Sequence, residues 1–108
     1  MIDAMRPGAR ACDVAEEGRK VLAPILDRVA FHHVYGYSLG ISYPPTWIEN
    51  GFFFLMPHNK AMLEPGMVFH LPLTLRLLGR FGAGFSEAVE ITATGARAFS
   101  VIERSLMG

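Results

Sequence analysis

The stretch GFSEAVEITATGARAF, residues 84–99, decides the architecture that the sequence predicts. Its first half alternates imperfectly between apolar and polar side chains, with Phe85 and Ile91 among the apolar ones, and this period of two favours a strand over a helix. The Ala-Thr-Gly segment at 93–95 is typical of a hairpin turn. Residues 96–102 then supply a returning strand, so the stretch predicts an antiparallel pair.

Another strand is predicted just before this pair. The segment MVFHLPL, residues 67–73, follows a Pro65-Gly66 turn and is rich in strand-forming residues. From residue 31 onward the helical period is absent, and aromatic residues, glycines and prolines dominate the sequence. We therefore expect strands and loops throughout the second part of the chain.

The first part of the chain predicts one helix. Apolar residues within 13–30 recur at three- and four-residue steps, the spacing that places them on one helical face. Asp13 is the expected N-cap, with Glu16 three residues later as in a capping box. Pro24 should kink this helix or end its first part. One helix followed by an antiparallel sheet is an α+β fold.

Length and composition predict incomplete burial of the apolar residues. A domain of 108 residues buries only about 60–70% of its unfolded surface. Yet 51% of the residues are apolar and 19% are charged, with apolar runs at 51–56 (GFFFLM) and 71–79 (LPLTLRLLG). We therefore expect a homo-oligomer or a missing piece of the same fold, and the first of these runs should be core or subunit interface.

Charge and hydropathy exclude two classes of partner. Ten basic residues balance ten acidic ones without a basic cluster, so we expect no nucleic acid partner. No apolar run reaches the roughly 18 residues needed to span a bilayer, and the N-terminus lacks a signal-peptide pattern. These features predict a cytoplasmic protein without a membrane partner. The single cysteine, Cys12, is expected to be a small packing residue.

One stretch is typical of a ligand loop. HHVYGYSLGISYPPTWIE, residues 32–49, combines two histidines, three tyrosines, two glycines, a Pro-Pro pair and the single tryptophan. Tyrosine and tryptophan join an apolar body to a polar tip, and glycine permits close backbone approach. We expect a small-molecule substrate to bind here in the intact protein.

Four stretches in this order resemble the pita-bread hydrolases, the family of methionine aminopeptidase, aminopeptidase P, Xaa-Pro dipeptidase and creatinase. The stretches are MRPGARACDVAEEGRKVL (5–22), GYSLGISYPPTWIE (36–49), LEPGMVFHLPL (63–73) and GFSEAVEITATGARAF (84–99). The resemblance covers nearly the whole chain. It implies that residues 1–108 form a single partial domain, the C-terminal half of a pita-bread fold, because a family catalytic domain is about twice this long.

The resemblance also shows where metal-binding residues are missing. The metal-binding histidine of the family falls on Tyr37, and a later histidine falls on Pro44. The first family glutamate falls near Pro72, and the last lies close to Ser86 and Glu87. Because a two-metal centre needs converging carboxylates and imidazole, and the family's pair of aspartates belongs to the absent half, we expect neither a metal nor another cofactor.

The form of the aromatic stretch resembles the creatinase-like and ectoine-hydrolase-like branch, whose members cleave C–N bonds in small substrates without metal. The resemblance implies a truncated homologue of a Xaa-Pro dipeptidase or creatinase-like hydrolase for amide or amidine substrates, inactive alone. Two alternatives remain open. One is a non-catalytic assembly module that pairs with itself or with an N-terminal half, and the other is a metal-dependent Xaa-Pro peptidase with unusual ligands.

Two residues are predicted to be catalytic. His33 matches a substrate-facing histidine of some family members, and an imidazole suits proton transfer near neutral pH. Glu87 and Glu90 are three apart, so in an alternating strand only one faces a pocket. By motif position we choose Glu87, as a substrate anchor or base. The structural alternatives are a hydrogen-bonded histidine at a strand start and a solvated carboxylate.

Four further side chains are predicted to bind substrate. They are Tyr37, Tyr43, Trp47 and His70. The two phenols are possible donors to a carboxylate or carbonyl, the indole is a stacking wall, and the imidazole is an inward-facing polar group. For each, packing with a satisfied polar tip is the alternative.

Overall fold

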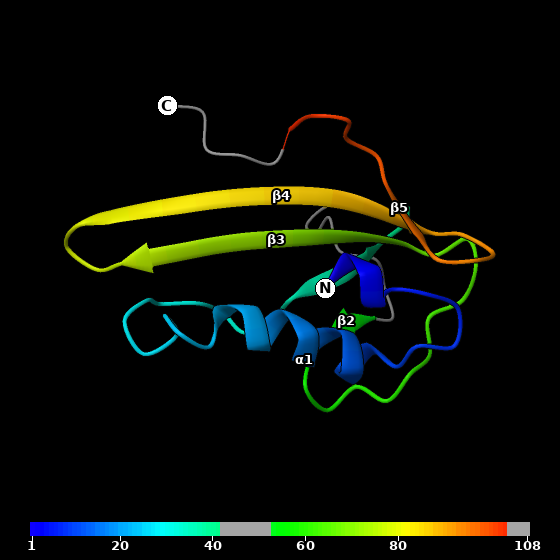
Figure 1. The fold of residues 1–108 in the computed structure, drawn as a ribbon, viewed down its shortest axis with the longest axis horizontal. Helices are drawn as coiled ribbons and strands as arrows, with labels where there is room; N and C mark the ends of the chain where they lie inside the picture. The colour runs from blue at the N-terminus through cyan, green and yellow to red at the C-terminus, as the bar shows by residue number, and fades with distance from the viewer. Residues whose placement is uncertain (42–52, 104–108) are drawn as a thin grey trace.

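The computed structural model describes residues 1–41 and 53–103. Its elements are η1 (Ile2–Ala4), α1 (Ala11–Leu22), β1 (Gly36–Leu39), β2 (Phe54–Leu55), β3 (Val68–Leu77), β4 (Phe81–Ile91) and β5 (Ala96–Ala98). The strands form one antiparallel sheet in the order β2-β1-β3-β4-β5, with α1 against one face (Figure 1). The predicted α+β architecture is confirmed.

The start of α1 differs from the prediction. Arg10 is the N-cap residue, in an extended conformation and without a side-chain cap. Asp13 lies inside the first turn, where it accepts a hydrogen bond from Arg10 Nε at 2.9 Å. The first helical N–H groups instead donate to backbone carbonyls of Asn59 and Ala61. The predicted Asp13 cap is therefore wrong, because a distant loop satisfies the N–H groups that a capping side chain would bind.

The end of α1 agrees with one of the two expectations for Pro24. The helix ends at Leu22, and Ala23 is its C-cap residue. Residues 23–28 continue as turns. A proline one residue beyond the cap cannot extend the helical hydrogen bonds, so Pro24 ends the helix rather than kinking it.

The β3–β4 hairpin is the longest paired unit. It runs from Val68↔Glu90 to Leu77↔Phe81, so both strands extend beyond the predicted segments. The turn predicted at 93–95, which connects β4 to β5, is confirmed, since Thr92 N–H donates to the Gly95 carbonyl at 2.9 Å. The strand predicted over 96–102 is shorter, because β5 ends at Ala98.

Pro72 lies inside β3 without removing a ladder bond. Arg76 exchanges two backbone hydrogen bonds with Ala30 on the β1 side of β3, and the alternation of a strand turns the nitrogen of Pro72 to the same side. The pairing with β1 ends at His70. Pro72 therefore sits where no N–H is needed, the condition under which a sheet tolerates proline.

The core lies between α1 and the sheet. Side chains of β3 and β4 alternate between two faces, and the face that packs on α1, here called the helix face, holds the fully buried Phe69, Val89 and Ile91. In the predicted core run, Leu55 is fully buried. On α1, a Cβ at Gly18 would lie 2.6 Å from Tyr35 Cδ1. Glycine at this position therefore sets how closely the helix approaches the sheet.

No helix in the part of the chain that the structure describes is long and apolar enough to cross a membrane.

Candidate functional site

The register of the sheet brings several predicted positions together on the face opposite α1, here called the site face. Tyr37 pairs with His70 across β1 and β3, and Pro72 pairs with Ser86 across β3 and β4. Cross-strand partners share a face, and residues two apart on β3 share it too. Tyr37 and Pro72, on or near which the family's histidine and first glutamate fall, thus share one surface with Ser86, whereas Glu87, the other residue close to the last family glutamate, pairs with Leu71.

Tyr37 and His70 form a hydrogen-bonded pair on the site face. The Tyr37 hydroxyl lies 2.6 Å from His70 Nδ1. The two rings meet edge to face, with centroids 5.0 Å apart and an interplanar angle of 85°. A neutral imidazole has two tautomers. In one the phenol donates its proton to Nδ1, and in the other Nδ1–H donates to the phenol oxygen.

The donor atoms on the site face do not fit the dinuclear metal centre of the resembled family. The matched positions offer a phenol at Tyr37, no donor side chain at Pro72 and a hydroxyl at Ser86. Within residues 1–41 and 53–103, no group of three or more histidine, cysteine, aspartate or glutamate side chains is placed to hold an ion. Hard divalent cations prefer carboxylate oxygens, which these positions do not supply.

Glu87 lies on the other face of the sheet. It pairs with Leu71 across β3 and β4, which puts it on the helix face, and its exposed fraction is only 6%. Its carboxylate accepts hydrogen bonds from the Ala88 N–H at 3.0 Å, the Ser100 N–H at 3.2 Å and the Ser100 hydroxyl. The carboxylate thus fastens the segment after β5 to β4, a placement that favours a structural role.

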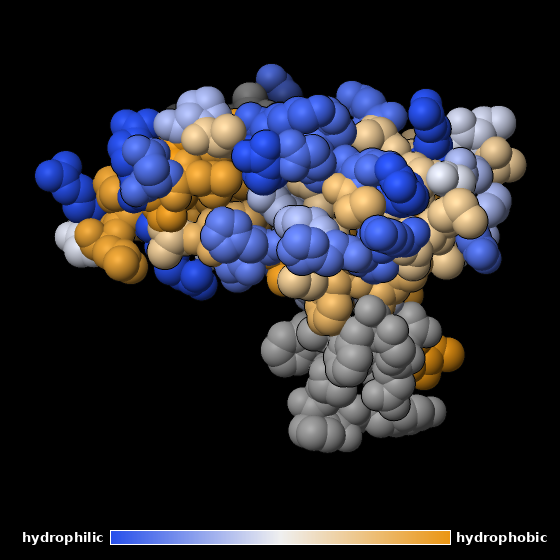
Figure 2. All heavy atoms as spheres, turned by 90° about the horizontal axis from the view of Figure 1, so that it is seen from below, coloured by the Kyte–Doolittle hydropathy of each residue, from blue (hydrophilic) through white to orange (hydrophobic). Residues whose placement is uncertain are grey.

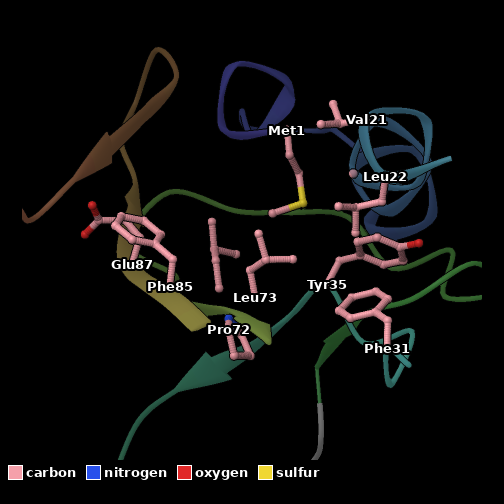
Figure 3. A pocket seen from close by; sticks show the side chains of 11 residues that line it. Met1, Val21, Leu22, Phe31, Tyr35, Pro72, Leu73, Phe85 and Glu87 are labelled. Carbon is pink, nitrogen blue, oxygen red and sulfur yellow. The ribbon is translucent and has the colours of Figure 1, made fainter. Parts of the chain in front are cut away.

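A cavity of about 220 Å³ lies between α1 and the β3–β4 hairpin. Its lining is almost entirely apolar: Met1, Gly18, Val21, Leu22, Phe31, Tyr35, Leu71, Pro72, Leu73, Phe85 and Glu87. Figure 3 shows the Glu87 carboxylate turned away from the cavity centre, whereas Met1 and Leu73 point into it. The cavity therefore offers packing surface but few polar contacts to a substrate.

Tyr35 is a buried phenol in the cavity wall. Its hydroxyl has no hydrogen-bond partner among the described residues, and burial raises the pKa of Tyr35, since the charged phenolate is disfavoured away from water. The hydroxyl points away from the cavity centre in Figure 3. The hydroxyl therefore lies between α1 and the sheet and is not placed to contact a molecule inside the cavity.

His33 lies apart from the Tyr37–His70 pair and from Glu87. It precedes β1 in an exposed position with a φ of 58°, an uncommon backbone conformation for a residue other than glycine. Its ring contacts Phe31 edge-on, with centroids 5.6 Å apart. Neither Glu87 nor Tyr37 is among the contacts the structure gives for His33 in the described part of the chain.

The neighbouring His32 has a local role. Its Nδ1 accepts a hydrogen bond from the Val34 N–H at 3.1 Å. Partial burial lowers the pKa of His32, with smaller contributions from the charges of Arg76 and His33. Tyr43 and Trp47, two of the predicted substrate-binding residues, lie outside the described residues, as do Pro44 and Glu49.

Sequence reasoning missed two residues of interest. Ser86, next to the chosen Glu87, shares the site face with Tyr37 and His70. Counting alternate residues along the paired strands would have separated Ser86 from Glu87, because adjacent residues point to opposite faces. Ser100, which binds Glu87, gave no local signal, since this contact joins residues 13 positions apart.

The arrangement of one helix on this sheet and the positions gathered on its site face agree with the comparisons to known proteins. The chain belongs to metallopeptidase family M24, whose sequence profile matches residues 1–93. It is 32% identical to ectoine hydrolase of Halomonas elongata over 108 aligned residues, which cover 97% of this chain and 26% of that protein.

Solved structures of the family share the fold. The dipeptidase PepE from Mycobacterium ulcerans superposes with a TM-score of 0.82 and 29% identity, over 98% of this chain and 27% of that one. A prolidase from Pyrococcus furiosus gives a TM-score of 0.78 at 22% identity, over 95% of this chain and 29% of its own. The pita-bread resemblance is confirmed, and the chain spans about a quarter of the length of these relatives.

Proposed function

We propose that this chain supplies one wall of a metal-independent active site that hydrolyses C–N bonds in small amide or amidine substrates, within a longer M24-family protein. The observation that carries this proposal is the Tyr37–His70 hydrogen bond of 2.6 Å. It occupies the site face at the position where the resembled family has its metal-binding histidine. A group that exchanges protons thus stands in place of a metal ligand.

The chemistry requires proton transfer at two points. Hydrolysis of an amide or amidine takes a proton from the attacking water and delivers one to the departing nitrogen. A phenol and a neutral imidazole in hydrogen bond are able to exchange a proton. In this proposal Tyr37 and His70 orient the substrate, take a proton from the attacking water and deliver one to the departing nitrogen. The role of His33 as proton carrier stays a prediction.

The assignment of Glu87 follows from its surroundings. A carboxylate that accepts bonds from Ser100 and the Ala88 N–H has a structural use already. The predicted role as substrate anchor would require it to exchange these contacts for a ligand on the opposite side of the sheet. We propose instead that Ser86, which faces the same side as Tyr37, contacts the substrate.

Ectoine is the first probe, because a 32% identical relative is named ectoine hydrolase. Titration of ectoine, a cyclic amidine, into the isotope-labelled 108-residue chain should shift the amide resonances of His70, Ser86 and Ala88. The Tyr37→Phe variant should bind at least tenfold more weakly, and a matched Val101→Ser variant, altered at an exposed residue, should bind normally. Shifts confined to Gly18 and Leu22, or none at 50 mM ectoine, would contradict the proposal.

Two further measurements separate the alternatives. The isolated chain should hydrolyse neither ectoine nor a Xaa-Pro dipeptide above the blank, and turnover would overturn its expected inactivity. Addition of Mn²⁺, Co²⁺ or Zn²⁺ should leave the melting temperature unchanged, since an ion that binds only the native state would raise it. A saturable rise would favour the metal-dependent peptidase.

A further inference from the structure

Two proton arrangements are possible in the Tyr37–His70 hydrogen bond, and its length distinguishes them. The Tyr37 hydroxyl lies 2.6 Å from His70 Nδ1. An N–H donor keeps an oxygen acceptor at about 2.7–3.2 Å, whereas a hydroxyl donor approaches its acceptor to about 2.5–3.0 Å. The observed separation lies outside the first range and inside the second, so it favours donation by the phenol to the imidazole.

His32 provides a reference for this distance within the same chain. Its Nδ1 accepts a hydrogen bond from the Val34 N–H at 3.1 Å. A backbone N–H is only a donor, so the N–H proton of a neutral His32 ring lies on Nε2. The contact at His70 Nδ1 is shorter than the contact at His32 Nδ1, as expected when the donor is a hydroxyl instead of an N–H group.

A polar contact is needed to select one tautomer of His70, because apolar packing is indifferent to which ring nitrogen carries the proton. The neighbours of His70 on β3, Phe69 and Leu71, are buried on the helix face. Exposed apolar side chains gather elsewhere, over the end of the molecule where the hairpin turns, as Figure 2 shows from the α1 side. The Tyr37 hydroxyl is therefore the group that distinguishes the two nitrogens of this ring.

We propose that Tyr37 is a positioning residue, whose phenol donates to Nδ1 of His70 and thereby keeps the N–H proton of the neutral ring on Nε2. A neutral imidazole has one N–H and one acceptor nitrogen, so Nε2–H is the group that His70 presents to a substrate. This assignment of roles rests on the proposed function and deepens it. His70 then contacts an acceptor atom of the substrate, such as a carbonyl oxygen or an unprotonated nitrogen.

The strand neighbours of His70 leave its Nε2 available for this contact. Tyr37 lies opposite His70 on β1 and binds Nδ1, so Nε2, on the other side of the ring, points away from the Tyr37 hydroxyl. On β4, Ala88 lies opposite His70, and Ser86 follows on the same face. Both side chains are small. In the part of the chain that the structure describes, no hydrogen bond joins Nε2 to another group.

The tautomer sets the order of the two proton transfers in the proposed hydrolysis. Nε2–H of His70 first delivers its proton to the nitrogen of the C–N bond, which makes that nitrogen a better leaving group. Water then adds its oxygen to the carbon, one of its protons passes to the bare Nε2, and the electron pair of the C–N bond leaves with the nitrogen. One proton leaves Nε2 and one returns, so the ring ends in its starting tautomer and Tyr37 keeps its own proton.

Nitrogen NMR of the isotope-labelled 108-residue chain tests the tautomer without a substrate. At a pH well above the ordinary histidine pKa of about 6.5, long-range proton–nitrogen correlation spectra distinguish a protonated ring nitrogen from a bare one. His70 should show the same pattern as His32, with Nε2 protonated and Nδ1 bare. A proton on Nδ1 of His70, or a ring that averages the two tautomers, would overturn the proposal.

The Tyr37→Phe variant tests whether the phenol selects the tautomer. It keeps the aromatic ring but removes the donor, so the nitrogen signals of His70 should move towards the average of two exchanging tautomers. His32 should keep its pattern, which reports that the local fold is retained. Tyr35→Phe is the matched control and should leave His70 unchanged, because the buried Tyr35 hydroxyl has no partner among the described residues. An unchanged His70 ring in Tyr37→Phe would overturn the positioning role of Tyr37.

The tautomer and the proposed function can fail separately. A chain with Nε2–H at His70 that does not bind ectoine would contradict the proposed function and leave the tautomer in place. A chain that binds ectoine but carries the His70 proton on Nδ1 would overturn the present inference alone. The spectrum of the parent chain decides the tautomer even if Tyr37→Phe does not fold.

Discussion

The two faces of the β3–β4 hairpin differ in what their side chains contact, although their residues alternate along the same strands. The helix face holds Phe69, Val89 and Ile91, which are fully buried against α1. The site face holds His70, Pro72 and Ser86, each of which is adjacent along its strand to a residue of the helix face. A shift of one position thus moves a side chain from the core to the opposite face of the sheet, and this distinction changes the interpretation of Glu87.

The largest contrast between the faces is expected at neighbouring residues of β3. Phe69→Ala should destabilise the chain by about 3–5 kcal/mol, because it leaves a cavity in the core. His70→Ala should cost about 0.5–1.5 kcal/mol, the net value of a hydrogen bond. Urea denaturation measures both. Similar losses for the two variants would mean that the site face is as much a part of the core as the helix face.

The next effect concerns the contact between α1 and the sheet. Gly18→Ala places a Cβ 2.6 Å from Tyr35 Cδ1 and 2.9 Å from Met1 Sδ. We expect overpacking to cost about 1–3 kcal/mol and to exceed the gain of up to about 1 kcal/mol in helix propensity. Gly82→Ala, with no contact closer than 3.6 Å, is the matched control. Stabilisation by Gly18→Ala in thermal denaturation would show that the helix moves away freely.

An effect of similar size tests whether Glu87 is structural. Glu87→Gln should cost about 1–3 kcal/mol, because it weakens charge-assisted bonds to Ser100, and most of this loss should vanish in a Ser100→Ala background. Glu90→Gln is the control, since its ion pair with Arg97 is at the surface and contributes about 0–1 kcal/mol. A double-mutant cycle without coupling would show that the bond to Ser100 does not stabilise the fold and would favour the predicted catalytic role of Glu87.

The smallest effect is a pH dependence at His32. Its pKa is lowered in the folded chain, chiefly by burial, so between that value and the ordinary pKa of about 6.5 the unfolded state binds more protons than the folded state. Stability from this group is therefore complete above about pH 6.5 and declines as the pH falls towards the folded pKa. Thermal unfolding at pH 7.5 and 5.5 measures the decline. His32→Gln should reduce it, and an unchanged decline would assign it to other groups.

The sequence predicted the parts of the fold that depend on local signals. Alternation and turn residues predicted the strands around 67–73 and 84–92, because both signals act over a few positions. The greater length of the hairpin was not predicted, although Leu71, Leu73, Leu75 and Leu77 alternate with other residues in the pattern of a strand. The start of α1 was not predictable locally, because Asn59 and Ala61 reach it from a distant loop.

The candidate site was predicted only in part, because it too depends on pairing between distant residues. The resemblance pointed to Tyr37 and strand alternation to His70, but their hydrogen bond depends on the register between β1 and β3, which no local pattern specifies. Glu87 was selected by motif position, and only its pairing with Leu71 assigns it to the helix face. Long-range pairing therefore decides on which face of the sheet each of two adjacent residues lies.

Pro72 has a consequence for how the hairpin folds. A strand that slips by one residue moves its apolar side chains to the wrong face. In β3, a one-residue slip would also turn the proline nitrogen towards β4, where it has no proton to donate. The misaligned hairpin would thus lose a backbone bond in addition to its core contacts. Because Pro72 has no N–H, β3 pairs less well in the misaligned register than in the native one. A misaligned folding intermediate should therefore be short-lived.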